Sequence, residues 1–383
     1  MKKLALALCL AMILSILPAS ALAADLDSFA AAAEEILPHL DEPFQNALAS
    51  NDPEELYASA QEYYERFTAR GMMDQYYGDA LRAHQLYLKA AELGFAKAQF
   101  AVARDYSGSL SYPIDRDDGE TFRWALKAAE QGYLTAYPPV INCYRNGTGT
   151  EQSEDSAKQW EEKLADDTAQ LLKEVSSPDC SDPGKLQMAA ECCQRGRGTD
   201  KDMDKALEYY QRAAEAGSDY CAATLGNLYR QTYDIEKNIA KSIEWYTKAC
   251  EMGNMPAGIS LASIYLYGAD QNGTEKNPEK AAAILQVLAE KGYVPAQTQL
   301  ADLYMSGEGV PWDSANAFEW YLKAAAQDDA YAQCELGDIF TYGLSDSDYN
   351  PLIAENRDLA KAFLTRASEN GYPRAADLLA NLG

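Results

Sequence analysis

One short sequence recurs along the chain, and it constrains the fold more than any other feature. Nearly the same six residues end at a glycine in "KAAELG" (89–94), "KAAEQG" (127–132), "RAAEAG" (212–217), "KACEMG" (248–253) and "RASENG" (366–371). Gly292 ends a related segment, and Thr168 and Asp328 hold the same place in two degenerate copies. The steps between these eight anchors are 38, 36, 49, 36, 39, 36 and 43 residues. Such a period, with small insertions, predicts a stack of helical hairpins.

The residues on each side of an anchor predict two helices. Positions −11, −8, −7 and −4 lie on one helical face, with alanines at its ends and large side chains in the middle. In one copy these positions are Ala206, Tyr209, Tyr210 and Ala213. We expect the anchor glycine to end this helix in the left-handed conformation. A second helix follows, with small residues at +4 and +9, and a glycine at +15 ends it.

Three features interrupt the pattern. Pro138 and Pro139 fall inside the helix that follows Gly132, and they should distort or shorten it. The copy that ends near Thr168 lacks its glycine and runs on into an irregular insertion near 169–185, centred on 176–184. We expect a kink or a partner-specific loop there. Gly-x-Gly recurs at 147–149, 196–198 and 307–309. No strand precedes it, so we interpret it as a turn and not as a phosphate cradle.

The first 23 residues have the pattern of a signal peptide. Lys2 and Lys3 precede an apolar run over 4–17, and Ala21-Leu22-Ala23 is a cleavage sequence. We expect cleavage before Ala24 and export to the periplasm, the cell surface or the medium. A retained N-terminal anchor is the alternative. No later stretch approaches the roughly 20 apolar residues of a membrane helix.

The chain is strongly acidic. Its formal net charge is −26, and removal of Lys2 and Lys3 would take it to −28. This charge argues against nucleic acid and anionic membranes as partners, and it permits a basic protein partner. His39 and His84 are isolated, and the cysteine spacing fits no zinc site. We therefore expect no metal and no cofactor.

The repeat resembles a known family. The segment "LADLYMSGEGVPWDSANAFEWYLKAAAQD" (300–328) is similar to the Sel1-like repeat, a relative of the tetratricopeptide repeat, and the resemblance covers 78–383. It implies an all-α protein, a right-handed α/α superhelical solenoid of about eight helical hairpins. Residues 24–77 match the repeat poorly and are expected to form a helical N-terminal cap. Export and the family together favour a bacterial source.

The resemblance implies a protein–protein interaction scaffold whose concave face binds a peptide or protein, in envelope or secretion-linked regulation or in host interaction. Positions +3, +7 and +10 form one polar stripe on the second helix of each repeat, away from its apolar face. Aromatic and acidic residues recur in this stripe, which favours a peptide or a basic protein as partner. The candidate binding residues are Arg104, Tyr220, Thr224, Asn227, Gln299, Asp302, Tyr331, Glu335 and Asp338.

Two other functions stay open. Exported cysteine-rich members of the superfamily are assigned β-lactamase-like or penicillin-binding activity, and they carry a cysteine pair in each repeat. Here only Cys221 and Cys250 fall near that pattern, and they are the disulfide candidate. The Ser-x-x-Lys motif of such hydrolases is absent, so we expect no enzyme. The other alternative is a structural protein that assembles through the edges of its solenoid.

Overall fold

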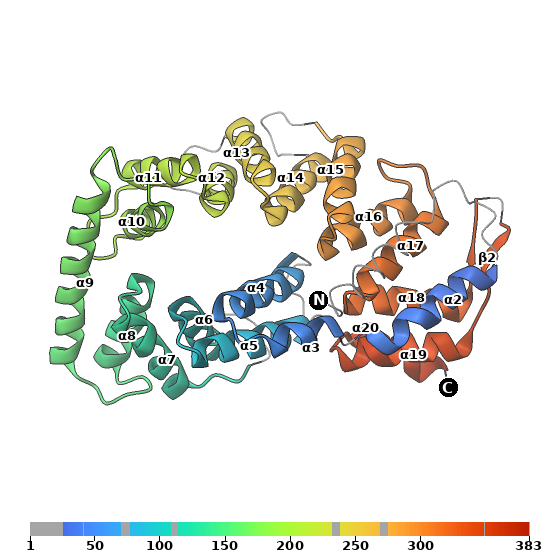
Figure 1. Ribbon diagram of the computed structural model, residues 1–383, viewed down its shortest axis with the longest axis horizontal. Helices are drawn as coiled ribbons and strands as arrows, with labels where there is room; N and C mark the ends of the chain where they lie inside the picture. The colour runs from blue at the N-terminus through green and yellow to red at the C-terminus, as the bar shows by residue number, and fades with distance from the viewer. Residues whose placement is uncertain are drawn as a thin grey trace. The chain divides into compact units, whose positions relative to one another are not determined.

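The computed structural model describes residues 26–40, 42–69, 77–108, 114–231, 238–268, 275–347 and 349–382. These residues are almost wholly helical (Figure 1), which confirms the all-α repeat solenoid. The predicted signal peptide lies outside the described residues. Among the helices that the structure describes, none combines the length and the apolar character needed to cross a bilayer.

The chain divides into two compact units. Unit 1 comprises residues 1–45 and 285–383, and unit 2 comprises residues 46–284. Two helices contain the boundaries, α3 (Glu42–Ala49) and α15 (Pro278–Glu290). The other helices of unit 2 are α4 (Pro53–Ala69), α5 (Tyr77–Glu92), α6 (Ala96–Tyr106), α7 (Asp118–Glu130), η2 (Leu134–Ala136), α8 (Tyr137–Asn146), α9 (Glu154–Val175), α10 (Pro183–Arg195), α11 (Met203–Glu215), α12 (Asp219–Gln231), α13 (Ile239–Glu251) and α14 (Met255–Tyr267).

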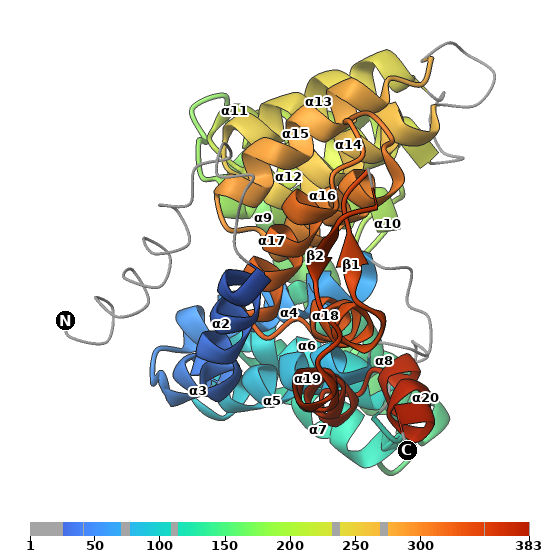
Figure 2. The same ribbon diagram turned by 90° about the vertical axis from the view of Figure 1, so that its right-hand side faces the viewer.

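Unit 1 combines the two ends of the described chain. Its remaining elements are α2 (Leu26–Ile36), η1 (Leu37–His39), α16 (Val294–Ser306), α17 (Ser314–Ala325), α18 (Ala330–Tyr342), β1 (Leu344–Ser345), β2 (Pro351–Ile353), α19 (Arg357–Glu369) and α20 (Pro373–Leu382). The two strands form a small antiparallel hairpin, and α2 packs against β2 (Figure 2). The last helix, α20, packs against α19 and α18. The sequence gives no signal for the hairpin or for the placement of α2.

The repeats that end at Gly94, Gly217, Asp328 and Gly371 bury the whole helix face that the sequence predicts. On α11 the side chains of Ala206, Tyr209, Tyr210 and Ala213 are all buried. Burial of each large side chain of this kind contributes on the order of 1.5–3 kcal/mol. The small residues at +9 allow neighbouring helices to approach closely. A Cβ on Gly226 would lie 2.6 Å from the Tyr246 ring, so even alanine would force that ring to move.

The anchor glycines end their helices as predicted. Their φ angles run from +80° at Gly371 to +103° at Gly217, the left-handed region that glycine adopts without strain. Asp328 also has a positive φ, +65°, so it fills the glycine position with a side chain. Thr168 does not end a helix, because α9 continues for two further turns to Val175.

The interruptions take definite forms. Tyr137 follows a 3-10 turn and begins a short α8, with both prolines in its first turn, where their missing N–H groups cost nothing. The irregular part of the insertion is confined to residues 176–182, between α9 and α10. Arg212 of α11 fixes this loop, because its guanidinium donates to the carbonyl oxygens of Val175 (2.9 Å), Ser177 (2.9 Å) and Cys180 (3.3 Å).

Candidate functional site

The predicted binding residues of unit 1 form contacts with one another and with the next repeat. Asp302 Oδ1 accepts hydrogen bonds from the hydroxyls of Tyr321 (2.6 Å) and Tyr331 (2.8 Å). The Tyr331 ring also meets Tyr372 edge-on, with 6.1 Å between centroids. Gln299 is half-buried on α16. These side chains therefore join α16, α17, α18 and the start of α20.

The two acidic residues of α18 share one arginine. Arg374 of α20 donates to Glu335 and to Asp338, the latter at 2.7 Å. Burial raises the pKa of Glu335, and Arg374 opposes that shift. One of the two negative charges of this pair is thus offset by Arg374, so the pair offers a partner less charge than the sequence suggests.

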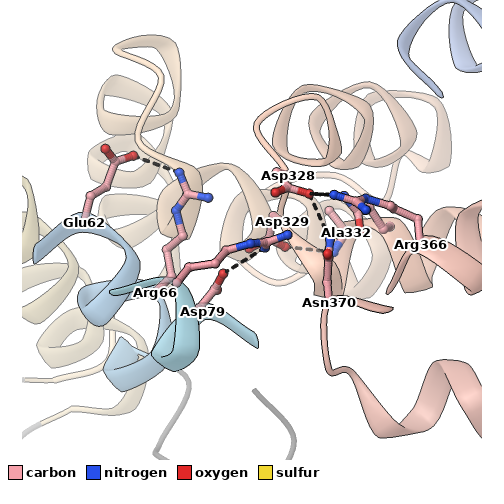
Figure 3. A network of polar contacts seen from close by, with 10 residues as sticks. Glu62, Arg66, Asp79, Asp328, Asp329, Ala332, Arg366 and Asn370 are labelled. Atoms are coloured by element: carbon pink, nitrogen blue, oxygen red, sulfur yellow. Dashed lines mark hydrogen bonds and ion pairs between the residues drawn. The ribbon is translucent and has the colours of Figure 1, made fainter. Parts of the chain in front are cut away.

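A second polar cluster in unit 1 is centred on the buried residues Asp328, Gln333 and Asn370. Asp328 Oδ1 accepts hydrogen bonds from Asn370 (2.8 Å) and Gln333 (3.1 Å), and Arg366 lies 3.4 Å away (Figure 3). Asn370 ends α19, and Arg366 lies one turn earlier. The side chain that replaces the anchor glycine therefore ties two successive repeats together, which indicates a structural role.

The predicted residues of unit 2 are more open. Tyr220 on α12 is 51% exposed, yet the surrounding chain desolvates its hydroxyl and raises its pKa, with the Glu191 carboxylate as the next largest cause of that rise. An exposed ring with a desolvated hydroxyl is expected on a concave surface, where solvent reaches the side chain although protein lies on several sides of it. Thr224 hydrogen-bonds Tyr220, and the exposed Asn227 accepts from the Tyr246 hydroxyl at 2.7 Å.

The charge of one carboxylate affects three tyrosines from separate elements. Burial raises the pKa of Tyr57 on α4, and it raises that of Tyr133, just before η2, to about 12. The charge of Glu191 on α10 contributes to the shifts of Tyr57, Tyr133 and Tyr220. Because Coulomb effects weaken with distance, these four side chains share one region. We call Tyr57, Tyr133, Tyr220 and Glu191 the inner tyrosine surface.

The arrangement of unit 2 explains this convergence. In Figure 1, α5 to α8 and α10 to α14 run along opposite sides of the unit, and the long α9 joins them at one end. Helix α4 packs on α5 and lies on the inner side, toward α12 (Figures 1 and 2). Segments far apart in the sequence therefore contribute to the same inner wall.

The inner tyrosine surface is held in place by its neighbours. Glu191 accepts hydrogen bonds from Gln187 (2.9 Å) and from Thr135, 56 residues away (3.3 Å). The Tyr57 ring meets Phe95 edge-on at 5.3 Å, and the Tyr133 ring lies 5.6 Å from that of Phe100. Side chains fixed in this way lose little conformational entropy when a partner binds.

Arg104 lies near this surface but is engaged within the unit. Its guanidinium lies 4.6 Å from the centroid of the Tyr64 ring and 3.5 Å from Asp105 Oδ1. Its charge lowers the pKa of Tyr57, against the larger effect of burial. Arg104 and Tyr220, two of the residues predicted from the sequence, therefore lie near one another in unit 2, and their role in binding stays a prediction.

Sequence reasoning missed Tyr57 and Tyr133 as candidates. Tyr57 belongs to the expected cap, outside the repeat columns. Tyr133 stands at position +1 of its repeat. The residue at this position is aromatic in four copies, and that recurrence could have indicated it. Those aromatic residues are Phe95, Tyr133, Tyr293 and Tyr372. Glu191 stands in the polar +10 column, but only the structure shows it among the tyrosines.

A polar hollow of about 570 Å³ lies between α8, α9 and the end of α10. Three guanidinium groups line it, those of Arg145, Arg195 and Arg197. Arg145 pairs with Glu161, at 2.5 Å from its carboxylate. The Gly-x-Gly turn at 196–198 also lines the hollow. The sequence alone indicated only a turn at this position.

The cysteines are mostly buried. Cys143 and Cys192 are both buried. Cys221 is buried on α12, and burial raises the pKa of its thiol to about 11. Cys250 is half-buried on α13. The structure holds both residues as thiols, and the bridge between them stays a prediction.

The histidines lie in separate polar pairs. His39 Nδ1 lies 2.8 Å from Glu42, and His84 Nδ1 lies 2.9 Å from the buried Asp105. Within the described ranges, no group of three or more His, Cys, Asp or Glu side chains is placed to hold a metal ion.

Comparisons with known proteins agree with the repeat architecture. The family model described as "Sel1 repeat" matches eight segments, 70–95, 96–133, 142–167, 184–218, 221–254, 259–293, 294–329 and 330–372. An uncharacterized protein of Neisseria meningitidis serogroup B is 26% identical over 159 residues, which are 36% of this chain and 32% of that protein. The chain thus spans about a third of the length of this curated relative.

Solved structures with similar folds come from several bacteria. A Sel1 repeat protein from Oxalobacter formigenes is 25% identical, with 65% of this chain and 91% of that chain covered and a TM-score of 0.39. A protective antigen, c5321, from uropathogenic Escherichia coli is 21% identical, with 93% of each chain covered and a TM-score of 0.30. An immunity protein from Pseudomonas aeruginosa is 20% identical, with 72% and 81% covered and a TM-score of 0.37.

Proposed function

The chain belongs to the Sel1 repeat family, and on this premise we propose that it is an exported scaffold that binds a peptide or protein partner on the inner tyrosine surface of unit 2. Sel1 repeat proteins generally mediate protein–protein interaction, and their solenoid is typically a non-catalytic scaffold. The proposal assigns that general role to one surface of this chain.

One observation carries the proposal. Tyr220 is half exposed although the surrounding chain desolvates its hydroxyl, and Tyr57 and Tyr133 lie in the same region. Tyrosine offers a large, rigid, amphipathic contact at low entropic cost, and it is enriched in protein interfaces. Tyrosine hydroxyls are protonated at neutral pH, so they can donate hydrogen bonds to a partner.

The chemistry of the surface favours a partner with a cationic group. A Lys or Arg side chain can lie over a tyrosine ring while it pairs with the Glu191 carboxylate. The net charge of −26 attracts basic proteins over longer distances. The corresponding acidic stripe in unit 1 supports a partner less well, because Arg374 already pairs with Glu335 and Asp338.

The proposed export rests on the signal-peptide pattern of residues 1–23. N-terminal sequencing of the protein isolated from its own cells should begin at Ala24. A sequence that begins at Met1 in the cytosolic fraction would contradict this part of the proposal and leave the binding surface untouched.

Site-specific photo-crosslinking tests the binding surface. A photoreactive phenylalanine analogue is placed at Tyr220 in one variant and at Tyr267 in a matched control. Tyr267 is a 73% exposed tyrosine at the end of α14 in the same unit. We expect a discrete adduct, formed in the producing cells, from position 220 and not from 267. Equal labelling at both positions, or none at 220, would refute the surface.

A non-catalytic role has its own test. Purified protein that hydrolyses a chromogenic β-lactam with saturation kinetics would contradict the scaffold role and favour the hydrolase alternative.

A further inference from the structure

The hollow between α8, α9 and α10 has a charge pattern that is unusual for this chain. The protein has 59 acidic and 33 basic residues, yet three arginines and one acidic residue line this hollow. Arg145 is neutralised by Glu161. Among the residues that the structure describes, no carboxylate lies within 4.0 Å of Arg195 or Arg197, so these two guanidinium groups have no ion-pair partner there.

The environment of Arg197 makes its charge costly. Burial lowers the pKa of this guanidinium, and the nearby Arg195 lowers it further, while Glu191 opposes the shift from a longer range. Arg195 is exposed and Arg197 is half-buried, and two like charges placed close together repel one another. A bound anion would relieve both effects.

The backbone holds Arg197 at this position. Gly196 and Gly198 on either side both have a φ of +65°. A Cβ on Gly198 would lie 2.6 Å from the Leu164 carbonyl oxygen, so the turn packs directly on α9. The guanidinium is therefore presented from a fixed turn and not from a flexible loop.

From this charge pattern we propose that the hollow binds a carboxylate group of a peptide, through Arg195 and Arg197. Arginine forms paired hydrogen bonds with carboxylates, and such bonds are roughly twice as strong as neutral ones. Pro138, Ile141 and Leu164 add apolar surface to the same hollow, which suits a peptide segment better than a bare ion. This site goes beyond the proposed function, and it would stand if the inner tyrosine surface bound nothing.

Fluorescence anisotropy of labelled peptides tests the proposal with the full mature chain. A tetra-aspartate peptide with an amidated C-terminus presents only side-chain carboxylates. A Gly/Ala peptide with a free C-terminus presents only the terminal carboxylate, and its amidated form presents none. We expect one of the first two to bind at low salt, to weaken as salt rises, and the third not to bind.

Three variants locate the binding. Arg195→Gln and Arg197→Gln should each weaken the peptide about tenfold, the loss expected for one charged hydrogen-bonding partner. Arg197→Lys keeps the charge but not the planar fork, so its loss should be smaller. Arg116→Gln is the control, because it removes an exposed arginine of the same unit that pairs with Asp118 outside the hollow.

Circular dichroism melting shows whether each variant is folded, and the exposed Arg195 provides the test if Arg197→Gln unfolds. Three results would overturn the proposal. In the first, the wild-type chain binds neither carboxylate peptide. In the second, both glutamine variants bind the peptide as tightly as wild type. In the third, the chain binds inorganic phosphate but neither peptide. None of these results depends on crosslinking at Tyr220, so failure of one proposal is distinguishable from failure of the other.

Discussion

The second glycine of a Gly-x-Gly turn allows successive repeats to touch, and the change Gly149→Ala tests this. Gly149 has a φ of +73°, and a Cβ there would lie 1.9 Å from the carbonyl oxygen of Asp118, the first residue of α7. Real Cβ contacts essentially never fall below 3.0 Å. The turn and α7 would therefore have to separate by about 1 Å.

The matched control is Gly132→Ala. Gly132 has a φ of +82°, and its added Cβ would meet nothing within 4 Å. Both changes impose the strain of a left-handed alanine, on the order of 1–2 kcal/mol. Only Gly149→Ala adds forced overpacking, about 1–3 kcal/mol. We expect it to lower the free energy of unfolding by about 2–5 kcal/mol, against about 1–2 kcal/mol for the control.

Urea unfolding measures this difference. Far-ultraviolet circular dichroism follows the whole chain. Tryptophan fluorescence follows Trp124, which is buried on α7, once the other four tryptophans are replaced by phenylalanine in both variants and in the reference protein. Because repeat stability is a sum of local and neighbour terms, the loss should be concentrated in the fluorescence transition. Equal losses for the two variants, within about 0.5 kcal/mol, would refute the packing argument and leave only backbone strain.

Three further predictions concern buried polar groups. Asn370→Ala should lower the free energy of unfolding by about 1–3 kcal/mol, because the buried Asp328 carboxylate loses its closest hydrogen-bond donor. An unchanged midpoint of urea unfolding would contradict this. Burial raises the pKa of Tyr133 to about 12, so its contribution to stability is complete below pH 10 and is lost as pH rises toward 12. The free energy of unfolding of Tyr133→Phe, relative to that of wild type, should therefore rise between pH 10 and pH 12. The rise is at most about 2.7 kcal/mol, and it is smaller for a partly exposed ring. A difference between the two proteins that stays constant over this pH range would exclude the raised pKa. The Cys221 thiol, buried and with a pKa of about 11, should react with iodoacetamide far more slowly at pH 8 than the partly exposed Cys180, as peptide mass spectrometry would measure, and similar rates would contradict that burial.

The repeat and its local geometry follow from the sequence because they depend on neighbouring residues. The periods of alanine and aromatic side chains define which helix face is buried, and Tyr209 and Tyr210 lie on that face. The anchor glycines predict left-handed helix ends because few other residues adopt that conformation. The prolines at 138 and 139 predict a changed helix start for the same local reason.

Contacts between distant residues were decided only by the tertiary structure. Nothing in the columns indicates that the charge of Glu191 reaches Tyr57, Tyr133 and Tyr220, because this depends on how successive hairpins curve within unit 2. The same holds for Arg374, whose approach from the next repeat neutralises the acidic stripe of α18. A repeat sequence thus specifies each hairpin, while the small rotations between hairpins, which accumulate along the chain, specify the surfaces that a partner can reach.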